Sequence, residues 1–263
     1  MRLSSTAFVS KFLFAFILLA ALSACAGNND KELLPDEPVD ALYTKGLDAL
    51  NNGDYKDAAK QFAEVDRQHP YSQWAVRAEV MEAYAYYQNM DYDEAVKALD
   101  QFIELHPGNS DIAYAYYLRA LCHYERILDV RRDQASAHDA LKSLQDVVNR
   151  FPDSEYAKDA VLKIALINDH LAGAEMEIGR YYIRQHLYIA ANGRFKTVID
   201  KYQTTSHVPE ALERLVEGYV AMGMFDEAKK NAAVLGYNFP GSDWYQDAYN
   251  LLRDKGIVLE QKK

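Results

Sequence analysis

The sequence has no excess of basic residues. Its 29 Lys and Arg are outnumbered by 39 Asp and Glu, and the formal net charge is −10 at pH 7. A surface of this sign repels the phosphates of nucleic acids, so we predict no nucleic-acid partner. The same charge argues against broad contact with anionic lipid headgroups.

The sequence also lacks the short motifs that mark common active sites. It contains no GxxxxGK[ST] phosphate loop, no HExxH, no CxxC and no GxSxG. Its seven histidines are scattered, and two of them, His69 and His106, directly precede a proline. We therefore predict a protein that is not an enzyme and that holds no metal and no dissociable cofactor. Titratable residues clustered on one face of the folded chain would favour an enzyme instead.

Long apolar runs are absent beyond the N-terminus. The run from Phe12 to Leu22 follows Arg2 and Lys11, and it is about half the roughly 20 residues that a membrane-spanning helix needs. A positive start, a short apolar core and small residues at its end are typical of a bacterial export signal. The tetrapeptide Leu22-Ser23-Ala24-Cys25, which closes the run, resembles the lipobox of bacterial lipoproteins.

The lipobox resemblance implies that residues 1–24 are a signal peptide cleaved before Cys25. It further implies an S-diacylglycerol on the Cys25 thiol and an N-palmitoyl group on the new amino terminus, and several acyl chains together hold a protein stably at a membrane. Ala26, in place of Asp, implies delivery to the outer membrane. Residues 25–38 would then form a lipidated flexible tether. An uncleaved anchor and ordinary signal cleavage are the two alternatives.

Cysteine is scarce, since Cys25 and Cys122 are the two in the chain. Lipidation of Cys25 would leave Cys122 without a partner, so we expect no internal disulfide. Cys122 ends an apolar and aromatic stretch, residues 116–122. That setting favours a buried small hydrophobe over a reactive thiol.

From Val39 onward there is almost no strand signal, and one pattern returns five times. A small residue is followed four positions later by an apolar or small residue and twelve positions later by a terminator. The sets are Ala58, Phe62, Pro70; Ala95, Leu99, Pro107; Ala140, Leu144, Pro152; Ala191, Phe195, Gln203; and Ala228, Ala232, Pro240. The small residue lets two helices approach, the second fills the groove between them, and proline ends the helix.

This is the tetratricopeptide-repeat (TPR) pattern, and it predicts an all-α TPR superhelix of five helix pairs with a C-terminal capping helix. Three repeats are expected over residues 39–154, and two repeats with the capping helix over residues 155–254, followed by a tail over 255–263. A long helix over roughly 155–185 would link the two sets, and the charged segment 129–136 would be a loop within the third repeat. Serines after the terminators are expected to cap the next helices: Ser72, Ser110, Ser154, Ser206 and Ser242.

Tyrosine is abundant, with 20 residues. Packing between helices is one interpretation of this abundance. A binding surface is the other, because aromatic side chains combine a large contact area with a polar tip. The first helices of stacked pairs line a concave face, so Tyr43, Tyr84 and Tyr117 are the candidates for a groove that binds a substrate peptide.

Four strings carry a resemblance to a known family: residues 83–87, 98–103, the Arg131-Arg132-Asp133-Gln134 segment, and the stretch from Asp169 to Tyr182. Together with the lipobox and the repeats, they resemble the BamD family, the lipoprotein of the β-barrel assembly machine (BAM complex) in the outer membrane. The similarity runs over roughly residues 41–241.

The resemblance implies a lipid-anchored periplasmic scaffold at the cell outer membrane. Such a protein binds the POTRA domains of BamA, joins other BAM lipoproteins, and recognises unfolded outer-membrane proteins for insertion. Arg194 matches a family arginine that pairs with a POTRA carboxylate, although a solvated helix arginine is the alternative. Substrate recognition would involve the region of Tyr84 and Tyr117. The alternative function is a periplasmic TPR lipoprotein that coordinates peptidoglycan or cell-division machinery.

Overall fold

A computed structural model describes residues 37–257 of the chain. The predicted signal peptide, Cys25 and most of the predicted tether, together with the last six residues of the predicted tail, lie outside this range. The described residues from Pro38 onward belong to one compact unit. None of the helices between residues 37 and 257 has the length and apolar character needed to cross a membrane.

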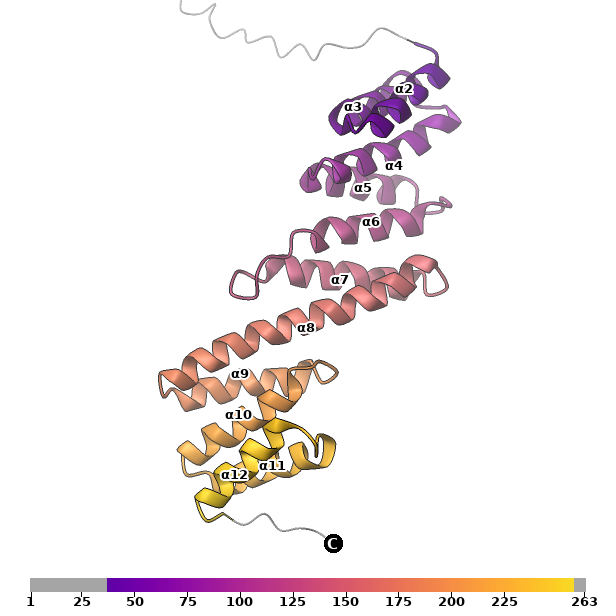
Figure 1. The fold of residues 1–263 in the computed structure, drawn as a ribbon. Coiled ribbons are helices and arrows are strands. Elements are labelled where there is room, and N and C mark those ends of the chain that lie inside the picture. Colours follow the sequence, from indigo (N-terminus) through magenta and orange to yellow (C-terminus); the bar gives the residue numbers. More distant parts are fainter. Residues whose placement is uncertain (1–36, 258–263) are drawn as a thin grey trace, which may run out of the picture. The chain divides into compact units, whose positions relative to one another are not determined.

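The described part of the chain contains eleven α-helices and no strand (Figure 1). The helices are α2 (Val39–Asn52), α3 (Tyr55–Gln68), α4 (Gln73–Gln88), α5 (Tyr92–Leu105), α6 (Ile112–Tyr124), α7 (Ala135–Arg150), α8 (Glu155–Arg184), α9 (Tyr188–Lys201), α10 (Val208–Ala221), α11 (Phe225–Asn238) and α12 (Asp243–Asp254). Each of α2 to α11 packs against the next in chain order, and α12 contacts α10 and α11. The predicted TPR fold is confirmed, with five helix pairs from α2–α3 to α10–α11 and a capping helix.

In two of these pairs a glycine on the first helix faces a phenylalanine ring on the second. A Cβ added to Gly46 would lie 2.7 Å from Cε1 of Phe62, and one added to Gly179 would lie 2.4 Å from Cε1 of Phe195. Both distances are shorter than atoms in contact allow, so the ring and not the backbone conformation requires glycine here. Both phenylalanines are fully buried.

The residues at these two positions differ in size from one repeat to the next. The equivalent pairs, in chain order, are Gly46–Phe62, Ala83–Leu99, Ala120–Leu144, Gly179–Phe195 and Val216–Ala232. In each of the three pairs without glycine, both residues are buried in one hydrophobic cluster. In every repeat one of the two positions therefore holds a larger residue and the other a smaller one, and in the fifth repeat the order is reversed.

Three of the five predicted serine caps are confirmed. Ser72, Ser154 and Ser242 each accept a hydrogen bond through their hydroxyl from a backbone N–H in the first turn of the next helix. The prediction was wrong for Ser110 and Ser206, because α6 and α10 begin one residue later than that role requires. Instead, the Ser206 hydroxyl donates to Asp169 on α8 at 3.0 Å.

Helix α8 has 30 residues, which corresponds to about 45 Å at 1.5 Å per residue. Ala160, Ile167 and Leu171 on α8 pack in a cluster with α6 and α7. Ala172 and Met176, further along, pack in the cluster that extends to α12. The long helix therefore contributes to the cores on both sides of it, as a linking helix would.

The loop in the third repeat spans residues 125–134, so it starts and ends earlier than the predicted 129–136. Ala135 and Ser136 already belong to α7. The side chain of Gln134 holds this loop in shape, since its amide donates to the carbonyls of Asp129 at 3.3 Å and Arg132 at 2.9 Å. The bounds differ from the prediction because α6 already ends at Tyr124 and α7 already begins at Ala135.

Cys122 is fully buried in the cluster between α4, α5 and α6. Burial raises the pKa of its thiol to about 12. The thiol is therefore protonated and inaccessible at neutral pH, and the interpretation of Cys122 as a small hydrophobe is confirmed.

The glycine–phenylalanine contact predicts opposite effects for two glycines of adjacent helices. Gly179→Ala drives a methyl group into the Phe195 ring, and overpacking of this kind costs about 1–3 kcal/mol. Gly193→Ala on α9 meets open space, so it should stabilise the protein by about 0.5–1 kcal/mol through helix propensity alone. Urea unfolding of both variants measures the difference, and equal effects would contradict the packing requirement.

Candidate partner-binding surfaces

The three predicted groove tyrosines lie on first helices, as expected, but in separate hydrophobic clusters. Tyr43 on α2 is half-buried, and its ring centroid lies 5.4 Å from that of Phe62 and 4.8 Å from that of Trp74. Tyr84 belongs to the next cluster and Tyr117 to the one after it. The structure therefore does not bring Tyr43 together with the other two, and the Tyr43 ring is used for packing.

Tyr84 and Tyr117 belong to a wider set of tyrosines on α4, α6 and α8. Tyr84 stacks on Tyr87, with ring centroids 6.5 Å apart. Tyr117 stacks on Tyr156 at 5.3 Å, and Tyr114 contacts the same ring at 5.7 Å. Sequence reasoning missed Tyr156, although its place two residues after the capping Ser154 puts it in the first turn of α8.

The hydroxyl of Tyr117 has an internal partner, Asp159 on α8, to which it donates a hydrogen bond. Asp159 also pairs with Lys163 at 3.2 Å. The bond from Tyr117 is the main reason that the pKa of Asp159 is lowered, while burial is the main reason that the pKa of Tyr117 is raised. Tyr117 thus fixes α6 to α8 through its polar tip and leaves only its ring for other contacts.

Arg194 lies on α9 and is 42% exposed, and it already has a partner within the chain. Its Nη1 atom lies 3.2 Å from Oε2 of Glu175 on α8, a side chain that is 22% exposed. A pair this open to solvent contributes little to stability. An external carboxylate can therefore replace Glu175 at small cost, which keeps Arg194 available to a partner.

A second arginine connects α8 to α10. The guanidinium of Arg180 binds Glu177 at 2.6 Å and Glu210 at 2.9 Å. Its Nη1 atom donates to Glu210 and its Nη2 atom to Glu177, so Arg180 is a structural residue rather than a free cation.

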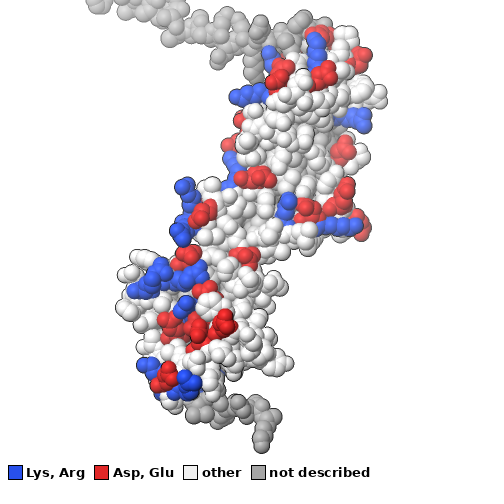
Figure 2. Space-filling view, viewed as in Figure 1, with Lys and Arg blue, Asp and Glu red and all other residues white. Residues whose placement is uncertain are grey.

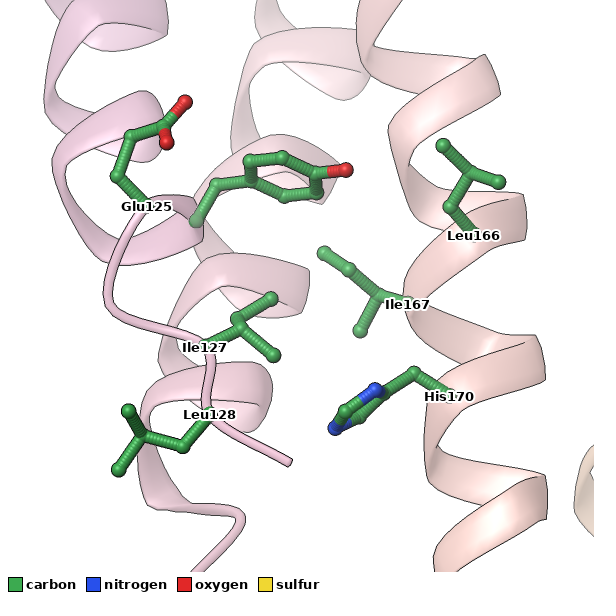
Figure 3. Close-up of a pocket in the computed structure, with 7 residues that line it drawn as sticks. Glu125, Ile127, Leu128, Leu166, Ile167 and His170 are labelled. Atoms are coloured by element: carbon green, nitrogen blue, oxygen red, sulfur yellow. The ribbon is translucent and has the colours of Figure 1, made fainter. Parts of the chain in front are cut away.

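A pocket of about 340 Å³ lies between the third-repeat loop and α8. Figure 3 shows Glu125, Ile127 and Leu128 from the loop facing Leu166, Ile167 and His170 from α8. Leu128 is 53% exposed and Leu166 is 60% exposed. The pocket therefore has a mixed lining, in which Glu125 and His170 stand beside apolar side chains, and it is open to solvent. Repeat spacing could not predict it, because the spacing does not encode the path of the loop along α8.

Among residues 37–257 no group of three or more His, Cys, Asp or Glu side chains is placed to hold a metal ion. What the described residues do offer is exposed aromatic, apolar and cationic side chains on a scaffold of paired helices. Such an arrangement serves protein recognition, and with the fold it defines a tetratricopeptide-repeat binding protein.

Comparison with known proteins identifies the family of the chain. A family model described as "Outer membrane lipoprotein" (YfiO) matches residues 35–253. The outer membrane protein assembly factor BamD of Caulobacter vibrioides is 52% identical, over 92% of this chain and 80% of its own. BamD of Rickettsia prowazekii is 46% identical, over 94% of this chain and 98% of its own. The chain therefore belongs to the BamD family.

Among solved structures, the TPR2AB domain of yeast Sti1, solved as a pHSP90 complex, superposes with a TM-score of 0.46 at 11% sequence identity. The superposition covers 83% of this chain and 85% of that chain.

The hydrogen bond between Tyr117 and Asp159 predicts different outcomes for two conservative changes. Tyr117→Phe should lower the free energy of unfolding by about 1 kcal/mol at pH 7, because a carboxylate loses a donor. The hydroxyl of Tyr84 makes no hydrogen bond to the described residues. Tyr84→Phe should therefore change the free energy of unfolding by less than about 0.5 kcal/mol.

Urea unfolding at two pH values measures both effects. Since the bond lowers the pKa of Asp159 in the folded protein, its contribution is present above the unfolded pKa and is lost as the pH falls through the folded pKa. The cost of Tyr117→Phe should therefore shrink in acid. A cost that is independent of pH would contradict this assignment.

Proposed function

We propose that this protein is a lipid-anchored periplasmic scaffold of the outer-membrane β-barrel assembly machine. The observation that carries the proposal is the match to outer membrane protein assembly factors over 92% and 94% of this chain and over 80% and 98% of the two relatives. A scaffold binds proteins rather than transforming small molecules, and exposed surfaces on rigid helix pairs suit that task. A non-enzymatic role follows from the same reasoning.

The proposed membrane attachment is the lipid at Cys25, with an N-palmitoyl and an S-diacylglycerol group. The Leu22-Ser23-Ala24-Cys25 tetrapeptide supports it, and several acyl chains are enough for stable anchoring without a spanning helix. The tether over residues 25–38 would keep the repeats in the periplasm, at the inner face of the outer membrane.

The proposed contact with BamA uses Arg194. Its support is the position of the guanidinium at an open pair with Glu175, 3.2 Å away. A carboxylate of a POTRA domain would take the place of Glu175, so the arginine would exchange one solvated pair for one at an interface. At an interface the pair is less screened by water and gains in strength.

The proposed surface for unfolded outer-membrane proteins is the tyrosine set on α4, α6 and α8. Its support is the half-buried state of Tyr84, Tyr114, Tyr117 and Tyr156, which leaves part of each ring accessible. Rings that are already held by packing lose little entropy when a peptide binds, and this favours affinity. Tyr43, which packs between Phe62 and Trp74, would border this surface rather than form its centre.

Binding of the detergent-solubilised full-length protein to the POTRA domains of BamA tests the proposal. Arg194→Glu should weaken binding by more than tenfold, about 1.4 kcal/mol. The matched control is Glu175→Gln, which releases Arg194 from its internal partner while leaving the cation in place. This control should bind at least as tightly as the unchanged protein.

Three other results carry distinct meanings. Equal loss in both variants would mean that the pair with Glu175, and not a contact from Arg194 to BamA, supports binding. Unchanged binding in Arg194→Glu would remove this residue from the interface. Absence of binding by the unchanged protein would contradict the proposed scaffold and favour a peptidoglycan or cell-division role.

A further inference from the structure

A second groove, of about 640 Å³, lies between the third-repeat loop and the C-terminal half of α8. Val130 from the loop and Ile178 and Tyr181 from α8 provide its apolar part. Ile178 is 37% exposed and Tyr181 is 53% exposed. These side chains give the groove an apolar floor that is open to solvent and can contact an apolar group of a ligand.

The loop side of this groove is held in place by its own hydrogen bonds. The Asp129 carboxylate accepts the backbone N–H of Arg131 at 2.9 Å, and the Gln134 amide donates to the Arg132 carbonyl at 2.9 Å. Val130 anchors the loop to α8 opposite Gly173, where an added Cβ would lie 3.6 Å from its Cγ1 atom. The groove is therefore formed before any ligand arrives.

The rim of the groove is cationic although the chain as a whole is acidic. Arg131 is 77% exposed, and its nearest carboxylate is Glu177 at 3.8 Å, a residue that already binds Arg180 at 2.6 Å. Arg132 and Arg184 are exposed and form no ion pair with the described residues. Figure 2 shows Lys and Arg side chains, with some Asp and Glu side chains among them, over the α6–α7 loop and the C-terminal end of α8.

We propose that this groove binds an extended acidic segment of a partner protein. Carboxylates of the segment would pair with Arg131 and Arg132, and an apolar side chain between them would lie on Ile178 and Tyr181. Charge complementarity selects an acidic ligand, and arginine pairs carboxylates in a bidentate manner. The apolar floor selects a polypeptide, because a phosphate group or a lipid headgroup alone has nothing to place there.

This surface goes beyond the proposed contacts with BamA and unfolded substrates. Neither Arg194 nor any of the tyrosines on α4 and α6 lines the groove. It is formed by the inserted loop of the third repeat, which a TPR helix pair does not need for its own packing.

Fluorescence anisotropy with the full-length protein in detergent tests the proposal. The probe is a short labelled peptide in which Asp and Glu alternate with Leu. Because the chain carries a net charge of −10, its overall field repels this probe, so binding reports a local site. Arg131→Glu combined with Arg132→Glu should weaken binding at least tenfold, and Ile178→Ser about fivefold.

The matched control is Lys56→Glu combined with Lys60→Glu. Both lysines are exposed on α3, and the change in net charge is the same, so probe affinity should fall by less than about twofold. A neutral probe with Asn and Gln in place of Asp and Glu should bind at least tenfold more weakly. Circular dichroism confirms that each variant keeps its helices.

Two results would overturn the proposal. Equal weakening by the arginine and lysine double variants would show that only overall charge matters. Displacement of the probe by inorganic phosphate or by phosphatidylglycerol vesicles, with Ile178→Ser unchanged, would assign the site to phosphate groups instead of a peptide.

Discussion

Each helix pair closes around a position where the bulk of one side chain fills the space that the facing residue leaves. In the fourth repeat this is the contact of Gly179 with the Phe195 ring, which a single added methyl group would enter. Because protein interiors are close-packed, the combined size of the two residues limits how closely the helices of a pair approach. The proposed binding surfaces lie on helices whose separation depends on such a contact. The packing within each pair therefore determines where the side chains of these surfaces lie.

Helix α8 shows how this packing positions function. Its N-terminal part shares a core with α6 and α7, and its C-terminal part shares one with α9 to α12. The partner of Arg194, the hydrogen-bond acceptor of Tyr117 and one wall of both pockets all come from this helix. One rigid element thus carries residues for several contacts, as a scaffold in the BamD family would require.

The repeating small residues and prolines were enough to predict the helix pairs, the long helix and the capping helix, because these signals act within one or two turns of the chain. Partners across helices were not predictable in the same way. Ser206 was expected to cap α10, yet its hydroxyl bonds Asp169, which is 37 residues away. Arg194 was found by resemblance, but its pairing with Glu175 depends on the rotation of α8 against α9, which spacing alone does not provide. The groove beside Val130 was missed for the same reason.

A double-mutant cycle on Gly179 and Phe195 tests the central claim most directly, that complementary volume sets the helix pairs. Phe195→Leu alone should destabilise the protein by leaving a cavity beside Gly179. Combined with Gly179→Ala it recreates the Ala83–Leu99 pair of the second repeat, so the account predicts a free energy of unfolding near that of the unchanged protein and a favourable coupling of about 1–3 kcal/mol. Strictly additive losses would contradict the claim.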